Sequence, residues 1–212
     1  SNAELCNLIS ATLLECGLKK DQFTINVSNR KIVQGLIDEL NISSEKQTKV
    51  IRAIDKLDKP GFGLSGVKAL LKKERKDSSG AITKGADLND VQAERILDFL
   101  KIKDLKKLKD KLTNPLSQEG IKEIEDFFQI LGFGKYKDQV QTNFTIVRGL
   151  AYYDGFIVET NLNFEVKNDK KKVIDIGSIC SGGAYAKLIS RFKGVDIPGT
   201  GISFGVDRLL FA

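Results

Sequence analysis

The pattern of apolar and polar residues over the first 40 positions alternates between helix and strand. Apolar side chains recur at helical spacing over residues 4–16, and Gly17 follows as a stop signal. Over residues 23–28 apolar side chains alternate with polar ones, which predicts a half-buried strand. Helical spacing returns between residues 32 and 40. The opening of the chain is therefore of mixed α and β character.

From residue 43 to residue 133 the pattern is helical and strand signals are nearly absent. Four apolar stripes at helical spacing cover residues 50–57, 67–71, 91–100 and 121–131. Asp87 and Asn89 are candidate N-caps for the third stripe, and Gly132 closes the fourth. We therefore predict a separate helical module here.

Strand-like segments return after residue 142 and follow one another at short intervals. They are residues 144–147, 155–160, 161–166, 173–176 and 202–206, with a polar hairpin tip at 168–172 and a short helix at 185–192. Contiguous strands of this kind favour antiparallel pairing, because no crossover helix separates them. The fold class predicted is α+β.

These patterns divide the chain into three segments. Residues 1–42 form the first part of a sheet domain, residues 43–133 an inserted all-helical domain, and residues 134–212 the second part. Within the insertion, Asp77-Ser78-Ser79-Gly80 predicts an exposed turn or loop.

Composition restricts the chemistry that is possible. The 212 residues are 41% apolar and 29% charged, which is typical of a soluble globular protein, and the apolar runs are too short to cross a bilayer. There is no histidine, so imidazole bases and Ser-His or Cys-His pairs are excluded. Cys6, Cys16 and Cys180 lack metal-ligand spacing, so we expect no metal site, three small buried thiols and a reducing, cytoplasmic location.

The net charge of +6 is unevenly distributed. Residues 41–135 carry 20 basic and 15 acidic side chains, which weakly favours a polyanionic partner for the middle of the chain. The sequence contains no methionine, and Ser1-Asn2-Ala3 resembles the remnant of a removed tag. We therefore expect the chain to be an internal part of a longer protein.

Three glycine-rich segments are candidates for ligand contact. On a strand, Arg148 and Tyr152 of Val147–Tyr153 would share a face, although an edge strand with a surface arginine explains this run equally well. Gly182-Gly183, read as a turn between a strand and a helix, could bring backbone amides to an anion, or could be an ordinary turn. In Gly199–Arg208, the glycines would let a ligand lie against the backbone and Arg208 could reach a phosphate.

Together these segments resemble the histidyl-tRNA synthetase family, which belongs to the class II aminoacyl-tRNA synthetases. Arg148-Gly149-Leu150-Ala151-Tyr152-Tyr153 is similar to the first histidine-binding signature of the family, Ser181–Tyr185 to its second, and Gly201–Leu209 to class II motif 3. Residues 29–36 and 53–59 resemble the segments that precede and open the insertion domain of the family. The resemblance covers nearly the whole chain.

The resemblance implies ATP-dependent activation of histidine to an adenylate, with Mg2+ accompanying ATP, and transfer to tRNA by a homodimeric parent protein. Arg148 would be catalytic, contacting the histidine carboxylate and the α-phosphate. The implied histidine-binding residues are Arg148, Tyr152, Tyr153, Gly182, Gly183 and Tyr185, and the implied ATP-binding residues are Gly201, Gly205 and Arg208.

The chain also departs from the family pattern. Ala151, Ala184 and Ala186 stand where the signatures usually carry other residues. Motifs 1 and 2 and the anticodon-binding domain have no counterpart in these 212 residues, so we expect the chain by itself not to activate histidine. Two alternatives remain open: a regulatory paralogue that does not charge tRNA, and a nucleic-acid-binding helical module on an inert sheet.

Lysines are crowded into residues 101–111. Lys103, Lys106 and Lys107 would share one face of a helix, with Asp110 at the next place on that face. We expect these three lysines to contact the acceptor side of tRNA, and we expect the affinity to depend strongly on salt.

Overall fold

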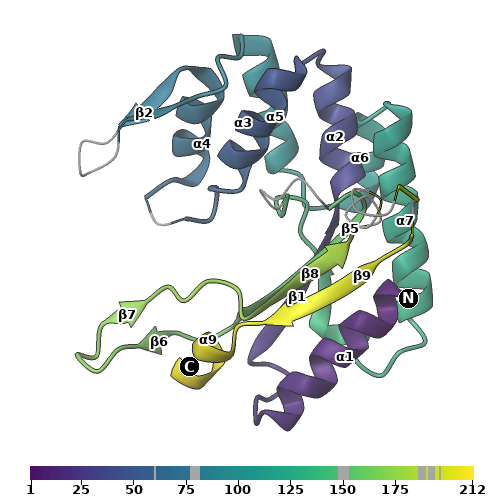
Figure 1. The fold of residues 1–212 in the computed structure, drawn as a ribbon, viewed down its shortest axis with the longest axis vertical. Coiled ribbons are helices and arrows are strands. Elements are labelled where there is room, and N and C mark those ends of the chain that lie inside the picture. Colours follow the sequence, from purple (N-terminus) through teal and green to yellow (C-terminus); the bar gives the residue numbers. More distant parts are fainter. Residues whose placement is uncertain (60, 77–81, 148–152, 186–189, 191–193, 196) are drawn as a thin grey trace. The chain divides into compact units, whose positions relative to one another are not determined.

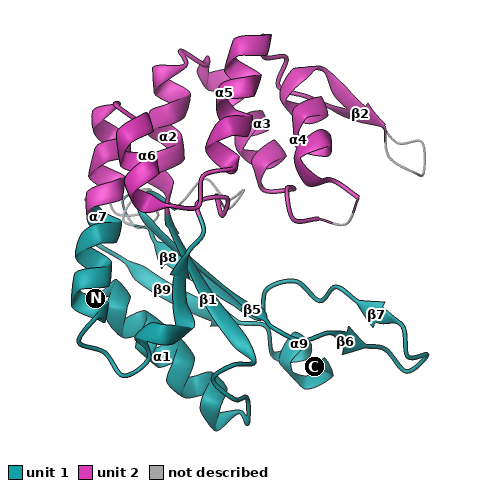
Figure 2. Ribbon diagram, turned by 180° about the vertical axis from the view of Figure 1, so that it is seen from behind, with its two compact units in different colours: residues 1–28, 123–143, 152–212 teal, residues 29–122, 144–151 magenta. Residues whose placement is uncertain are grey.

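The computed structural model describes the chain except residues 60, 77–81, 148–152, 186–189, 191–193 and 196 (Figure 1). The chain divides into two compact units (Figure 2). Unit 1 contains residues 1–28, 123–143 and 152–212, and unit 2 contains residues 29–122 and 144–151. Each unit has its own buried apolar side chains.

Unit 1 is built on a five-stranded mixed sheet. In spatial order its strands are β4 (Val140–Thr142), β1 (Phe23–Asn29), β5 (Phe156–Leu162), β8 (Cys180–Ala184) and β9 (Thr200–Phe204). β1 pairs with β4 in parallel, whereas β5, β8 and β9 pair in antiparallel fashion. The sheet is therefore dominated by antiparallel pairs, as the run of contiguous strands predicted.

One face of this sheet is apolar and is covered by helices. Helix α1 (Asn2–Glu15) packs beside β8 and β9, and it buries Cys6, Ile9 and Leu13 completely (Figure 1). The ring of Phe127, from the later turns of α7 (Pro115–Leu131), lies 4.8 Å between centroids from the ring of Phe156 on β5. This covered face is the core of unit 1.

A small hairpin and a terminal helix complete unit 1. Among the described strands, β6 (Val166–Lys167) and β7 (Val173–Ile174) pair with each other as a separate two-stranded sheet. A 3-10 turn, η1 (Lys137–Gln139), leads into β4. The hairpin tip is ordered by Asn168, whose Oδ1 accepts hydrogen bonds from two backbone amides of the lysine run at 170–172. Helix α9 (Val206–Phe211) follows β9 directly.

Unit 2 is mainly helical. Its helices are α2 (Arg30–Glu39), α3 (Ser44–Ile54), α4 (Gly63–Lys72), α5 (Asp90–Leu100), α6 (Leu105–Lys111) and the first turns of α7. It also contains an antiparallel hairpin of β2 (Glu74–Lys76) and β3 (Ile82–Lys84). In the described part of the chain no helix has the length and apolar character needed to cross a membrane.

Helices α2 and α7 make close contact within unit 2. A Cβ atom on Gly35 would lie 2.3 Å from Ser117 Oγ, so only glycine fits there. The hydroxyl of Ser117, which is fully buried, donates a hydrogen bond of 2.9 Å to the carbonyl of Ile32. This contact satisfies a polar group that would otherwise be buried without a partner.

Most of the predicted helices are confirmed, including several of their ends. Asn89 caps α5 in a reciprocal arrangement with Gln92, and Gly17 adopts a φ of +96° just after α1. The N-cap predicted at Asp87 was wrong, because that residue precedes the cap. The predicted turn at residues 77–80 lies outside the described residues.

Two predicted features differ from the structure, and one observed hairpin was not predicted. Phe144, Ile146 and Val147 are buried but form no strand, since the pairing of β4 with β1 ends at Thr142, which lies opposite Val27. The two strands predicted for 155–166 are one longer strand, β5, followed by the short β6. The hairpin β2–β3 was not predicted, because its six residues lack an apolar alternation.

Candidate active site

The second face of the sheet in unit 1 is polar. Gln141 Nε2 donates to Asn26 Oδ1 at 2.9 Å, and Asn26 Nδ2 donates to Asn161 Oδ1 at 3.0 Å. This amide ladder joins three adjacent strands, β4, β1 and β5. Alternation along each strand places Ser28 and Glu159 on the same face. A sheet face lined by amides, hydroxyls and a carboxylate can hydrogen-bond a small polar ligand.

Gly182 and Gly183 lie within strand β8, so the turn predicted between a strand and a helix was wrong. A Cβ atom on Gly182 would lie 2.0 Å from the carbonyl oxygen of Gly201, and one on Gly183 would lie 2.3 Å from that of Phe156. Both glycines therefore let the neighbouring strands approach closely, and no helix begins at either of them.

Two tyrosines lie over a pair of glycines at this end of the sheet. Gly183 of β8 and Gly201 of β9 are directly opposite each other. A Cβ atom on Gly183 would lie 2.9 Å from Tyr153 Cδ1, and one on Gly201 would lie 2.6 Å from the hydroxyl oxygen of Tyr185. Because side chains of opposed residues leave the same face of a sheet, Tyr153 and Tyr185 share the face that carries the amide ladder.

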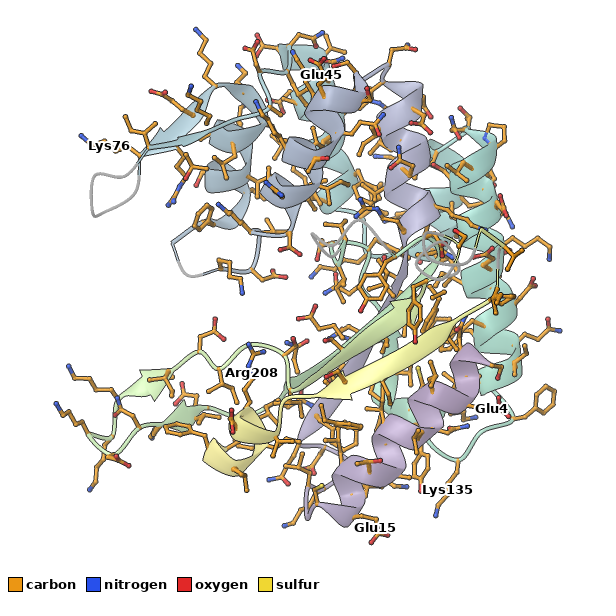
Figure 3. The ribbon with its side chains drawn as sticks, viewed as in Figure 1. Glu4, Glu15, Glu45, Lys76, Lys135 and Arg208 are labelled. Atoms are coloured by element: carbon orange, nitrogen blue, oxygen red, sulfur yellow. The ribbon has the colours of Figure 1, made fainter. Side chains whose placement is uncertain are left out.

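Arg208 lies at the other end of β8 and β9, where the β6–β7 hairpin leaves the sheet (Figure 3). Its Nη1 donates a hydrogen bond to the carbonyl of Ser178, and its side chain is exposed. The amide of Gly205 bonds to the carbonyl of Ile179 at 2.8 Å, which fixes the start of α9. A guanidinium held in this way keeps further N–H donors for an anion.

The distance between the two ends follows from the strand itself. Gly183 is three positions along β8 from Cys180, so the tyrosine pair and the Arg208 end lie roughly 10 Å apart along this strand. Gly205 and Arg208 therefore come together at one end, and Tyr153, Gly183, Tyr185 and Gly201 at the other. Gly201 was expected to lie with the phosphate-binding residues, yet Tyr185 covers it.

Arg148 and Tyr152 lie outside the described residues, as do Ala151, Ala186 and most of the helix predicted at 185–192. Tyr185 itself follows β8 and is not helical. The amide ladder is the part of this face that the sequence analysis missed. Its signal was present, because Thr24, Asn26 and Ser28 alternate with apolar residues along β1.

The lysines of the insertion lie in unit 2. Lys106 and Lys107 belong to α6, whereas Lys103 precedes Asp104, the N-cap of that helix. The prediction that all three share one helical face was therefore wrong for Lys103. All three side chains are exposed.

The buried thiol of Cys6 is a poor nucleophile. Burial, and to a smaller extent the nearby Cys180 thiol, raises the pKa of Cys6 to about 12. Cys6 and Cys180 are buried, as predicted, but Cys16 is exposed. A thiol with so high a pKa remains protonated at neutral pH, so Cys6 acts as a small apolar side chain.

The mostly antiparallel sheet is similar to that of a solved class II enzyme. The structure of histidyl-tRNA synthetase from Nostoc sp. PCC 7120 matches with a TM-score of 0.75 and 30% sequence identity, covering 99% of this chain and 45% of that one. Residues 1–209 match the family model described as histidyl-tRNA synthetase, and the chain belongs to this family.

Curated relatives agree with this assignment. Over 212 residues the chain is 74% identical to the histidine–tRNA ligase of Pelagibacter ubique. The match spans all of this chain and 46% of that relative. It is 38% identical to the histidine–tRNA ligase of Rhizobium meliloti, of which it covers 44%. The chain therefore spans less than half the length of these relatives.

Proposed function

We propose that the full-length protein containing these 212 residues activates histidine with ATP and transfers it to tRNA. The observation that carries this proposal is the 74% identity to a histidine–tRNA ligase along the entire chain. Because the chain covers 46% of that relative, the activity is proposed for the full-length protein.

The geometry of unit 1 supports separate binding positions for histidine and ATP at the two ends of β8. Histidine would bind at the end with Tyr153, Tyr185 and the Gly183–Gly201 pair, near the amide ladder. The triphosphate of ATP would bind towards Gly205 and Arg208, where a guanidinium is exposed. Gly182 would act indirectly, by allowing β9 to approach β8.

Arg148 is proposed as the catalytic residue, contacting the histidine carboxylate and the α-phosphate, with Tyr152 in the histidine pocket. A guanidinium placed where charge develops on the transferring group stabilises the transition state more than the ground state. In the full-length protein, Arg148→Ala should therefore lower histidine-dependent ATP–pyrophosphate exchange by roughly a hundredfold or more, with a smaller change in histidine affinity.

Arg148→Lys should restore little activity, because a point charge does not replace a bidentate donor. An Arg148→Ala variant that exchanges pyrophosphate at the normal rate would show that this arginine has no catalytic role. Absence of histidine-dependent exchange in the unmodified full-length protein would overturn the proposed activity itself.

A regulatory paralogue that does not charge tRNA is the second candidate. Ala184, at the end of β8, stands where the second signature usually carries an arginine, and this departure favours it. A solved protein from Bacillus halodurans, described as an ATP phosphoribosyltransferase regulatory subunit/histidyl-tRNA synthetase, shares the fold with a TM-score of 0.73 at 16% identity. The same exchange assay separates the two candidates, since the paralogue would not exchange pyrophosphate.

We also propose that residues 43–133 form the insertion domain and bind the acceptor side of tRNA through Lys103, Lys106 and Lys107. Their exposure and the positive charge of residues 41–135 support this. Replacing all three by alanine in the full-length protein should reduce tRNA charging, most strongly at low salt, while adenylate formation is unchanged.

A control with equal loss of charge is available in unit 1. Lys19, Lys20 and Lys137 are also exposed, and replacing them by alanine should leave charging unchanged. Equal losses in the two triple variants would mean that net charge, and not this lysine cluster, determines tRNA affinity.

The remaining parts of the proposal concern assembly and location. We propose that the full-length protein is a cytoplasmic homodimer and that Mg2+ enters with the phosphates of ATP. Sedimentation of the full-length protein would test the first point, because a monomer at micromolar concentration would contradict it. Dependence of the exchange reaction on added Mg2+ would test the second.

A further inference from the structure

Arg30 makes a long-range contact that the proposed catalytic residues do not explain. It is the first residue of α2, and its Nη1 donates a hydrogen bond of 2.6 Å to the carbonyl oxygen of Val147. The two residues are 117 positions apart in the sequence and belong to the same unit. Burial lowers the pKa of the Arg30 guanidinium, and the nearby Asp55 carboxylate opposes that shift.

The carbonyl that Arg30 holds has a particular place in the chain. It belongs to the peptide group that joins Val147 to Arg148, so its position is one covalent bond from the backbone nitrogen of Arg148. Val147 is buried and lies outside any strand, so no sheet ladder fixes this peptide group. The side chain of Arg30 does so instead.

The backbone at Arg30 is itself well fixed. Strand β1 passes directly into α2, and the buried Asn29 caps the helix by accepting a 3.0 Å hydrogen bond from the amide of Lys31. Two residues further on, the hydroxyl of Ser117 donates a hydrogen bond to the carbonyl of Ile32. Arg30 is therefore a donor on a rigid support, aimed at the segment that leads into the first histidine-binding signature.

We infer that Arg30 is a positioning residue for Arg148. This inference rests on the proposed function. Nη1 of Arg30, on a helix start fixed by Asn29, holds the carbonyl oxygen of Val147, the residue before Arg148, and a displacement of about 1 Å at a reacting group can lower the rate a hundredfold. Arg30 touches no reacting atom in this role, so its effect on catalysis must pass through Arg148.

The test is a double-mutant cycle in the full-length protein, read out by histidine-dependent pyrophosphate exchange. Arg30→Met keeps most of the side-chain volume and removes every donor. It should lower kcat by about 10- to 100-fold and change the KM for ATP little. In an Arg148→Ala background the same substitution should have almost no further effect, because residues that act through one another are not additive.

Two more variants separate positioning from a general loss of folding. Arg30→Lys keeps one charged donor and should recover part of kcat, at a melting temperature close to that of the unmodified protein. Lys31→Met removes the neighbouring side chain, which pairs with Glu119 at 2.7 Å, and should leave exchange unchanged.

Losses from Arg30→Met and Arg148→Ala that multiply in the double variant would overturn the positioning role and leave the proposed function intact. An equal loss of kcat in Lys31→Met would also overturn it, because that change breaks the contact of α2 with Glu119 and leaves the side chain of Arg30 in place. Absence of exchange in the unmodified protein would instead refute the proposed function.

Discussion

Gly183 offers the sharpest test of how the sheet supports the tyrosine pair. In Gly183→Ala the new Cβ atom would lie 2.3 Å from the carbonyl oxygen of Phe156 and 2.9 Å from the ring of Tyr153. The first contact is with main chain, so β5 or β8 must shift to relieve it. Overpacking of this kind costs about 1–3 kcal/mol, and a clash with backbone belongs at the upper end.

For a protein of this size, a loss of about 3 kcal/mol lowers the melting temperature by roughly 6–12 °C. Thermal unfolding of the 212-residue protein followed by circular dichroism measures this. The chain has four tyrosines and no tryptophan, so displacement of Tyr153 should also change its intrinsic fluorescence.

Gly155→Ala is the matched control, because a Cβ atom there would meet Ala184 at an ordinary 3.6 Å. It should leave the melting temperature unchanged or raise it slightly. If Gly183→Ala were as stable as Gly155→Ala, the close approach of β5 to β8 would not be the reason for glycine at position 183.

Three further predictions concern stability. Ser117→Ala should lower the free energy of unfolding by about 0.5–1.5 kcal/mol in urea titrations, because the buried hydrogen bond from its hydroxyl to the carbonyl of Ile32 is lost; an unchanged midpoint would contradict this. Asn89→Ala should cost about 1 kcal/mol in the same assay by removing the cap of α5, whereas Asn89→Gly should cost only a few tenths. The pKa of Cys6 is raised from 9.0 to about 12 in the folded protein, so the unfolded chain loses this proton first as pH rises. Stability attributable to Cys6 is therefore complete below pH 9 and lost progressively towards pH 12, and Cys6→Ala should show a smaller decrease in stability between pH 9 and pH 11.

The helices were predictable because their apolar periodicity is local. The ends of α1 and α5 could be placed from Gly17 and Asn89, since capping depends on neighbours within one turn. Residues 144–147 show the limit of this reasoning. Phe144, Ile146 and Val147 are apolar and buried, but burial alone does not require a strand, and the pairing of β4 with β1, which is distant in sequence, stops at Thr142.

For the candidate site, the sequence indicated which residue types to expect but not how the strands arrange them. Gly182 and Gly183 have the composition of a turn, yet they are glycine because strands distant in sequence pass within van der Waals distance. The polar alternation of β1 indicated a second face, but not that Gln141 and Asn161 would continue it on the two neighbouring strands. Strand order is a property of the whole fold, and no local pattern specifies it.

The β6–β7 hairpin has a consequence for self-association. A two-stranded ribbon leaves unpaired backbone groups on both edges, and Val173 adds an apolar side chain that is 56% exposed. Lysines at 167 and 170–172 place positive charge along and beyond these edges, so that two copies approaching edge to edge would repel each other. Replacing Lys170, Lys171 and Lys172 by serine should increase light scattering of the concentrated protein on warming. Scattering equal to that of the unmodified protein would mean that these lysines do not protect the ribbon.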